Sequence, residues 1–213
     1  MKSTTPDWPT KTIHRTYNSH KITLQVISDF DAVLDYCAEH YPDNTDMIPY
    51  YADLWPSAEA LAQHIADNHQ NLSGKRIIEL GCGLGLPSLL CAKLGADVTA
   101  TDFHPHNKTN FNRNALNNNL NNITYRNMDW SRPHNNLGKF DIIIGSDLLY
   151  EAKQIKSLTS AIPTLLAPNG TFILADPGRD HIQTATDSLA SYHHQITIRN
   201  NIFIITFSSP NPY

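Results

Sequence analysis

Short apolar runs alternate with longer polar or amphipathic stretches along this chain from residue 76 onward. The runs with the length and composition of strands are residues 76–80, 97–101, 123–126, 140–145 and 170–175. The stretches that follow them and predict helices are residues 86–94, 105–120, 151–166 and 178–192. Strands and helices that alternate in this way predict a mostly parallel sheet covered by helices on both faces. The run 140–145 is almost wholly apolar and is therefore expected at the centre of the sheet.

The two ends of the chain predict hairpins. Residues 195–199 and 202–207 are rich in β-forming side chains and are separated by Asn200-Asn201, which predicts an antiparallel pair at the edge of the sheet. Near the other end, residues 12–17 and 21–27 predict a strand pair, followed by helices over 30–40 and 58–68. The predicted fold is therefore α/β and doubly wound, with a mostly parallel seven-stranded sheet and an antiparallel C-terminal hairpin. We expect a small N-terminal extension over residues 1–55 and the main domain over residues 56–213.

The composition of the chain is typical of a globular protein and does not by itself indicate a function. The chain has 213 residues, of which 40% are hydrophobic and 17% charged, as expected for one globular domain with a full core. Its 16 basic and 20 acidic residues give a net charge of −4, which argues against a nucleic-acid-binding surface. No stretch approaches the length of a membrane span, and no signal peptide is expected.

Three residue types invite specific interpretations. The cysteines Cys37, Cys82 and Cys91 are odd in number and form no C-x-x-C pair, which favours a reducing cytoplasm. The histidines, including His104, His106 and the pair at 193–194, lie at no familiar ligand spacing, so we expect them to be exposed and expect no metal. The asparagine-rich stretch 107–122 predicts a solvated surface.

The segment Glu79-Leu-Gly-Cys-Gly-Leu-Gly85 lies between the first core strand and the first core helix, where a glycine turn predicts a nucleotide site. A dinucleotide fingerprint would place its third glycine at position 86, but the third glycine is Gly85. In addition, the carboxylate of Glu79 would repel a pyrophosphate. The segment therefore favours a positively charged ligand over a nicotinamide dinucleotide.

Acidic residues follow the next strands at the edge where ligands bind in open α/β sheets. Asp102 ends the second core strand at the spacing of a ribose-binding acid, although a helix cap or turn would also place an Asp there. Asp129 and Trp130 follow the third strand, where they could bind an adenine or form an ordinary polar turn. Asp147 and Tyr150 follow the fourth, where they emerge at this edge next to the bound ligand, or else cap the next helix and pack.

Together these residues resemble a class I S-adenosylmethionine-dependent methyltransferase. Asp147-Leu-Leu-Tyr150 and Leu54-Trp55-Pro56 are similar to motifs of the protein-lysine methyltransferase group sometimes called methyltransferase family 16. The resemblance covers residue 49 to the C-terminus, and Asp176-Pro-Gly-Arg179 resembles its bacterial members. It implies a Rossmann-like fold, the cofactor S-adenosylmethionine and a lysine-bearing protein substrate. From the net charge and the lack of a long apolar stretch, we expect neither a nucleic acid nor a membrane as partner.

The resemblance also implies roles for individual residues. Glu79 and the backbone of the glycine turn would hold the methionine part of the cofactor, Asp102 the ribose, and Asp129 with Trp130 the adenine. Trp55 would cover the cofactor, while Asp147 and Tyr150 would face the acceptor. The full set expected at the cofactor is Trp55, Glu79, Gly81, Cys82, Gly83, Gly85, Asp102, Phe103, Asp129, Trp130 and Ser146.

Other acceptors and functions stay open at this point. The chain lacks the Asn/Asp-Pro-Pro-Tyr/Phe motif of amide or adenine methylation and the Pro-Cys pair of pyrimidine C5 methylation. A small-molecule amine N-methyltransferase is the nearest alternative, and an interaction module that binds the cofactor without catalysis is another.

Overall fold

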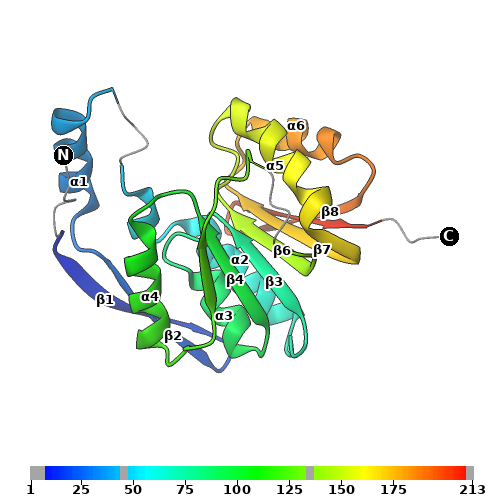
Figure 1. The fold of residues 1–213 in the computed structure, drawn as a ribbon, viewed down its shortest axis with the longest axis horizontal. Coiled ribbons are helices and arrows are strands. Elements are labelled where there is room, and N and C mark those ends of the chain that lie inside the picture. The colour runs from blue at the N-terminus through cyan, green and yellow to red at the C-terminus, as the bar shows by residue number, and fades with distance from the viewer. Residues whose placement is uncertain (1–7, 44–47, 133–136, 210–213) are drawn as a thin grey trace.

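A computed structural model describes residues 8–43, 48–132 and 137–209, and its centre is a seven-stranded sheet (Figure 1). The strands lie in the order β5-β4-β3-β6-β7-β9-β8, and β9 alone runs antiparallel to its neighbours. Their bounds are β3 (Arg76–Leu80), β4 (Asp97–Asp102), β5 (Thr124–Asn127), β6 (Phe140–Ser146), β7 (Leu166–Asp176), β8 (His193–Arg199) and β9 (Ile202–Ser208). This confirms the predicted fold class.

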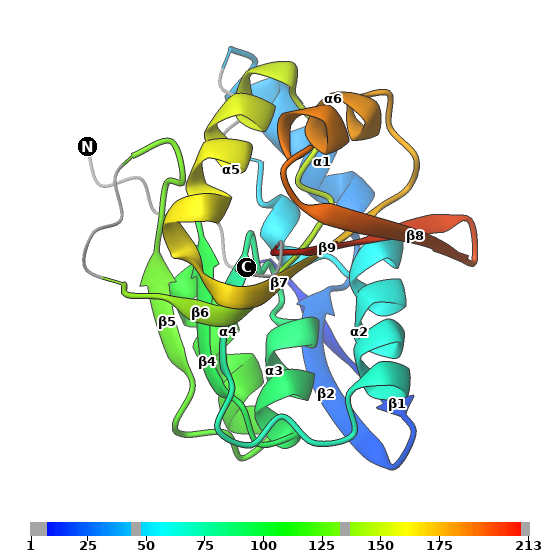
Figure 2. The same cartoon turned by 90° about the vertical axis from the view of Figure 1, so that its right-hand side faces the viewer.

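Helices cover both faces of the sheet, because alternate residues of the central strands point to opposite sides. They are α2 (Pro56–Asn68), α3 (Leu86–Lys93), α4 (Asn107–Asn117), α5 (Ala152–Leu165) and α6 (His181–Ser188). On β6, Ile142 and Ile144 pack in one cluster with α2, α3 and α4, whereas Ile143 packs in the other with α5 and α6. Figure 2 shows the two helical layers on either side of the strands.

Some boundaries differ from the expected ones for local reasons. Helix α4 ends at Asn117 because Asn119 has φ 58°, a left-handed conformation that stops a helix. Strand β7 begins at Leu166 instead of residue 170, pairs there with Phe140, and shifts its register before Ile142. Helix α6 is shorter than expected, and β8 begins at His193.

The N-terminal segment packs on the layer formed by α2, α3 and α4. It contains the antiparallel strands β1 (Thr10–Tyr17) and β2 (His20–Ile27), then α1 (Phe30–His40) and a 3-10 turn, η2 (Tyr50–Ala52). The inner side chains of β2, namely Ile22, Leu24 and Val26, belong to the same apolar cluster as α2 and α3. The hairpin is therefore part of the core and not an appendage beside it.

Three asparagines of the Asn-rich stretch are buried, so the expected solvated surface is wrong for them: Asn107, Asn114 and Asn118. The amide of Asn118 accepts a hydrogen bond from Thr23 N (2.9 Å) and donates one to Thr23 O (2.7 Å), as a neighbouring strand would. Asn114 accepts from Gln25 N (2.8 Å) in the same manner. Four helical residues span about 6 Å and two strand residues about 6.7 Å, so the two asparagines match alternate residues of β2.

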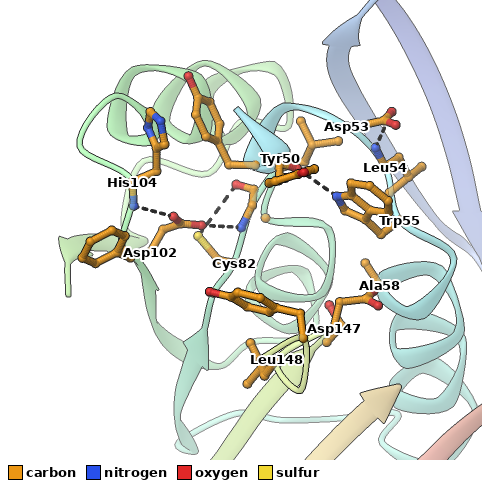
Figure 3. A pocket seen from close by; sticks show the side chains of 18 of the residues that line it. Tyr50, Asp53, Leu54, Trp55, Ala58, Cys82, Asp102, His104, Asp147 and Leu148 are labelled. Carbon is orange, nitrogen blue, oxygen red and sulfur yellow. Dashed lines mark hydrogen bonds between the residues drawn. The ribbon is translucent and has the colours of Figure 1, made fainter. Parts of the chain in front are cut away.

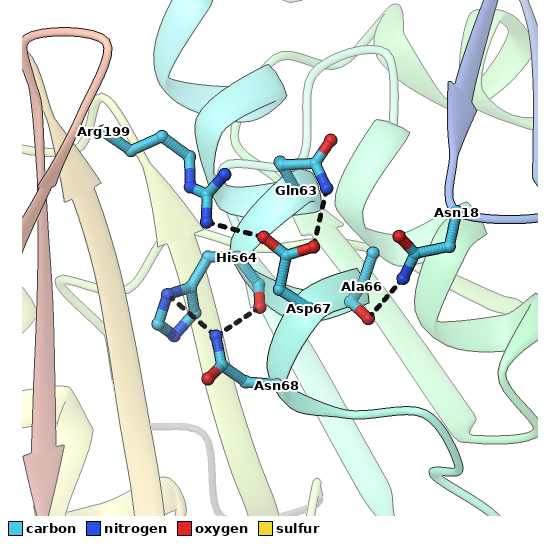
Figure 4. Close-up of polar contacts among 7 residues, drawn as sticks. All are labelled: Asn18, Gln63, His64, Ala66, Asp67, Asn68 and Arg199. Carbon is cyan, nitrogen blue, oxygen red and sulfur yellow. Dashed lines mark hydrogen bonds and ion pairs between the residues drawn. The ribbon is translucent and has the colours of Figure 1, made fainter.

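Helix α2 is also joined to the turns of both hairpins, as Figure 4 shows. Asn18, in the turn between β1 and β2, donates to Ala66 O (2.8 Å). Arg199, at the end of β8, pairs with Asp67 (2.6 Å), whose second oxygen accepts from Gln63 (2.8 Å). These contacts hold the C-terminal end of α2 between two hairpins that are far apart in the sequence.

The contacts of Asn118 lead to a stability prediction. Asn118→Ala leaves two partly buried backbone groups of Thr23 without these partners, which should lower the free energy of unfolding by about 1–3 kcal/mol. Asn112→Ala, at an exposed position of the same helix, should have no effect or a slightly stabilising one. Urea denaturation of both variants measures the difference, and equal stabilities would contradict the strand-like role of Asn118.

Candidate functional site

A cavity of about 500 Å³ opens at the carboxyl ends of β3, β4 and β6, within the size range of small-molecule sites (Figure 3). Its walls come from the glycine turn after β3, the loop after β4, the loop after β6 and the segment that precedes α2. Asp102 and His104 lie toward one side, and Asp147 and Ala58 toward the other. This is the edge where ligands bind in open α/β sheets.

The structure brings together all but two of the residues expected at the site. Those that line the cavity are Trp55, Gly81, Cys82, Gly83, Gly85, Asp102, Phe103, Trp130, Ser146, Asp147 and Tyr150. Glu79 and Asp129 lie outside the lining. Segments as far apart in sequence as Trp55 and Tyr150 thus meet around one space.

The glycine turn is packed so closely that side chains would not fit at two of its positions. A Cβ at Gly85, where φ is 85°, would lie 2.5 Å from the Phe111 ring. A Cβ at Gly81, where φ is 64°, would lie 2.8 Å from Leu148 and 3.7 Å from Trp130. These glycines permit both the left-handed backbone and the close approach of its neighbours.

Side chains of α4 hold the carbonyl groups of the same turn. Asn107 donates to Gly83 O (2.9 Å), and Asn114 donates to Leu84 O (3.1 Å). Because Asn114 also accepts from Gln25 N, one side chain connects the turn to the N-terminal hairpin. No local sequence pattern predicts this contact, since the partners are separated by 30 and 89 residues.

Asp102 forms the wall of the cavity at the end of β4 and is 8% exposed. One of its oxygens accepts from Gly83 N (2.9 Å) and the other from His104 N (2.9 Å). Burial raises the pKa of Asp102, while these hydrogen bonds act in the opposite direction. Each oxygen can accept a second hydrogen bond, which the hydroxyls of a ribose could donate.

Glu79 lies behind the glycine turn and is fully buried. Its Oε2 accepts from Ser88 N (3.0 Å) in the first turn of α3, where a helix offers free N–H groups. Its Oε1 has no hydrogen-bond partner among the described residues. Burial raises the pKa of Glu79 to about 8, against the hydrogen bond from Ser88. Glu79 thus supports the turn from within instead of lining the cavity.

Asp129 takes part in a local turn. It accepts from Ser131 N (2.9 Å) and Ser131 Oγ (2.6 Å) and pairs with Arg132 (3.1 Å). The hydrogen bond from the Ser131 hydroxyl is the main reason why its pKa is lowered. The neighbouring Trp130 lines the cavity. Of the two alternatives that the sequence left open for Asp129, the structure contains the polar turn.

Asp147 has φ 58°, an uncommon conformation for a residue with a side chain. Its backbone N–H donates to Ala175 O (2.9 Å), and its Oδ1 pairs with Arg179 (2.9 Å). Burial raises the pKa of Asp147, whereas Ser57 and Arg179 favour its charged form. Arg179 also lines the cavity, although only its motif, and not its role, was noted in the sequence.

The sequence prediction also missed the aromatic segment before α2. Tyr50 and Tyr51 line the cavity, and Tyr50 O accepts a hydrogen bond from the indole of Trp55 (2.8 Å). Tyr51 packs against His104 with ring centroids 4.5 Å apart. His104 is 6% exposed, so the expectation of exposed histidines is wrong at this position. The signal for this segment was its aromatic content next to Leu54-Trp55-Pro56.

Neither metal-binding clusters nor membrane-spanning helices were found in the described parts of the chain. No group of three or more His, Cys, Asp or Glu there could hold a metal ion. Over those same residues, every helix is too short or too polar to cross a membrane. Cys37, Cys82 and Cys91 are buried free thiols, and burial raises the pKa of Cys82 well above its usual value.

Comparison with known proteins adds independent information. A family model described as lysine methyltransferase matches residues 49–186. The chain is 34% identical to the histidine protein methyltransferase 1 homolog of Dictyostelium discoideum, over 62% of this chain and 46% of that protein. It is 33% identical to the histone-arginine methyltransferase METTL23 of Xenopus laevis (53% and 50% covered). It is 30% identical to the electron transfer flavoprotein beta subunit lysine methyltransferase of the same species (62% and 53%).

The chain thus spans about half the length of the curated relatives it matches. Among solved structures, it shares its fold with a 16S rRNA methyltransferase of T. thermophilus, determined in complex with AdoMet and guanosine. The TM-score is 0.71 at 14% identity, with 96% of this chain and 52% of the other covered.

The burial of Glu79 predicts a pH-dependent stability. Because the folded pKa of about 8 exceeds the ordinary 4.5, the folded state favours the protonated form. Protonated Glu79 therefore contributes its full share to the free energy of unfolding below pH 4.5. This contribution declines as the pH rises and is lost above pH 8. It amounts to about 5 kcal/mol.

Glu79→Gln keeps a neutral acceptor for Ser88 N and should therefore exceed the wild type in stability increasingly from pH 5 to pH 9. Urea denaturation of the ligand-free proteins at pH 5, 7 and 9 measures this difference. Glu39→Gln, whose side chain is 80% exposed, is the control and should show no such trend. A difference for Glu79→Gln that does not change with pH would show that Glu79 does not titrate in this range.

Proposed function

Because the chain belongs to the lysine methyltransferase family whose model matches residues 49–186, we propose that it methylates a protein side chain with S-adenosylmethionine. The observation that carries this proposal is the cavity itself. A tightly packed glycine turn, the buried acid Asp102 and the pair Asp147–Arg179 meet around it at the edge of the sheet. The names of its relatives, which are protein histidine, histone-arginine and protein lysine methyltransferases, agree with it.

The residues of the cavity suit this cofactor. Gly81, Gly83 and Gly85 line the cavity with backbone that carries no side chain, which lets a ligand approach the main chain closely, and the Trp130 ring lines the same cavity. In our proposal Asp102 accepts hydrogen bonds from the ribose hydroxyls, Trp130 packs on the adenine, and Trp55 with Tyr50 covers the ligand. Glu79 contributes by holding the turn, and Asp129 by shaping the loop that carries Trp130.

When bound, S-adenosylmethionine supplies an activated methyl group on a positively charged sulfur. The protein's task is to align the acceptor and exclude water. Asp147 and Tyr150 lie where β6 ends, and Tyr150 is half exposed at the cavity. We propose that they orient the acceptor nitrogen, with Trp55 and Tyr150 as the apolar wall beside it.

Lysine is the acceptor that we propose, on the strength of the family description and of the acidic residues at this end of the cavity. A free lysine has a pKa near 10.4, and its ammonium has no lone pair until the proton leaves. An apolar wall and a nearby sulfonium disfavour the ammonium, whereas Asp147 favours its arrival. Asp147 is therefore cast as an orienting group and not as a strong base. The buried free cysteines lead us to propose a cytoplasmic location as well.

The acceptor can be identified directly. Purified protein with methyl-labelled S-adenosylmethionine should transfer label to protein in a lysate of the native host, and acid hydrolysis should release labelled N-methyllysine. Label in methylhistidine or methylarginine would replace lysine as the acceptor residue. Label in small metabolites alone would establish a small-molecule amine methyltransferase. No transfer despite tight cofactor binding would leave an interaction module.

Asp147→Ala tests the acceptor end separately from the cofactor. Loss of the orienting carboxylate should lower methyl transfer by at least 100-fold and leave the affinity for S-adenosylhomocysteine within a few fold of the wild type. Calorimetry with S-adenosylhomocysteine and with NAD measures the affinity, and only the first ligand should bind. Asp180→Ala, an exposed residue of a nearby loop without a capping hydrogen bond, is the control for both measurements. A large loss of affinity would instead place Asp147 in the cofactor site.

A further inference from the structure

We infer that Arg179 is a positioning residue, which holds the carboxylate of Asp147 in place at the acceptor end of the cavity. The expected effect of Arg179 on methyl transfer rests on the proposed function. The structural part of the inference, the link between three residues at the ends of β6 and β7, can be tested without activity.

Arg179 is fixed from behind by Asp176, which ends β7 and has no exposed surface. One oxygen of Asp176 accepts from Gly178 N (3.0 Å) and Arg179 N (2.8 Å). The other accepts from the Arg179 guanidinium at 2.7 Å. The turn is closed by Gly178, whose φ of 101° suits glycine and where a Cβ would lie 2.9 Å from Phe203. Asp176 therefore binds both the backbone N–H and the guanidinium of Arg179, which holds the side chain against its own turn.

The same nitrogen of Arg179 that contacts Asp176 lies 2.9 Å from Asp147 Oδ1. Ser146 and Ala175 are paired in the parallel register of β6 and β7, so Asp147 and Asp176 are the next residues on two adjacent strand ends. Their carboxylates converge and would repel each other without a cation between them. Arg179 supplies that cation and ties the two strand ends together.

The arrangement also sets the charge that an acceptor meets. Asp147 and Asp176 with one guanidinium carry a net charge of −1, which suits a single cationic side chain. Arginine remains charged at any working pH, and its planar group can contact two carboxylates at once. The charged groups known to act on Asp147 are Arg179, which favours ionisation, and Asp176, which opposes it. Removal of Arg179 should therefore raise the pKa of Asp147 and release its left-handed backbone from one of its restraints.

Both contacts of Arg179 are within the protein, which is why we assign it to positioning. Its side chain is 32% exposed, and its guanidinium already pairs with two carboxylates. A cationic acceptor would be repelled by it and attracted by Asp147. The role of Arg179 is therefore exerted through Asp147 and not by contact with the acceptor.

Arg179→Gln tests the inference by activity. We expect kcat to fall by 30-fold or more, while the affinity for S-adenosylhomocysteine stays within threefold of the wild type. The acidic limb of the pH profile of kcat should move to higher pH, because Asp147 would ionise later. Added methylguanidine should restore part of the activity. Arg179→Lys, which keeps the charge, should retain more activity than Arg179→Gln, and Arg113→Gln, at an exposed position of α4, should behave as the wild type.

An unchanged kcat and pH limb in Arg179→Gln would overturn the inference, as would a loss explained wholly by weaker cofactor binding. A readout without activity separates it from the proposed function. NMR titration of carboxyl-labelled aspartates, with the Asp147 signal assigned from Asp147→Asn, should show a higher pKa for Asp147 in Arg179→Gln than in the wild type. If the wild type transfers no methyl group, this shift still supports the link between Arg179 and Asp147, and its absence still refutes it.

Discussion

The close packing of the glycine turn is the constraint on which much of the structure depends. Because Gly81 and Gly85 carry no side chain, Leu148 and the Phe111 ring reach positions that a Cβ would occupy. Phe111 belongs to α4, so α4 can approach closely enough for Asn107 and Asn114 to bond the turn carbonyls. The same approach sets the distance at which β2 lies along α4. The shape of the cavity and the attachment of the hairpin thus follow from one feature of the backbone.

The cavity wall contains one buried acid, Asp102, and one partly buried acid, Asp147, and different groups stabilise the two. At the end of β4, Asp102 is stabilised by backbone N–H groups of Gly83 and His104, which are fixed dipoles without net charge. At the opposite side, Asp147 is stabilised by the guanidinium of Arg179. Backbone donors leave the full negative charge of Asp102, whereas the guanidinium is shared between two carboxylates. This difference between the two ends of the cavity agrees with our proposal that Asp102 binds an uncharged ribose and Asp147 a cationic acceptor.

The sequence predicted what depends on local pattern and missed what depends on distant contacts. Every predicted strand after residue 76 is present, because alternate positions such as Ile142 and Ile143 must face two apolar layers. The motif Glu79–Gly85 located the cavity, but not that Glu79 would lie behind its wall. Asp129 precedes the cavity-lining Trp130, but its side chain accepts a hydrogen bond from Ser131 N instead of lining the cavity. Composition does not decide whether such a carboxylate binds a neighbouring backbone group or a ligand.

The N-terminal hairpin is attached to the rest of the protein partly through Asn114 and Asn118, whose burial the sequence pattern did not predict. The family match begins at residue 49, after β1, β2 and α1. Even so, β2 contributes Ile22, Leu24 and Val26 to the shared core, and its free edge is occupied by Asn114 and Asn118. Because Asn114 bonds both Gln25 N and Leu84 O, displacement of the hairpin would free a side chain that holds the glycine turn. A segment outside the family match therefore supports the cavity, through asparagines whose composition alone suggested nothing more than a solvated surface.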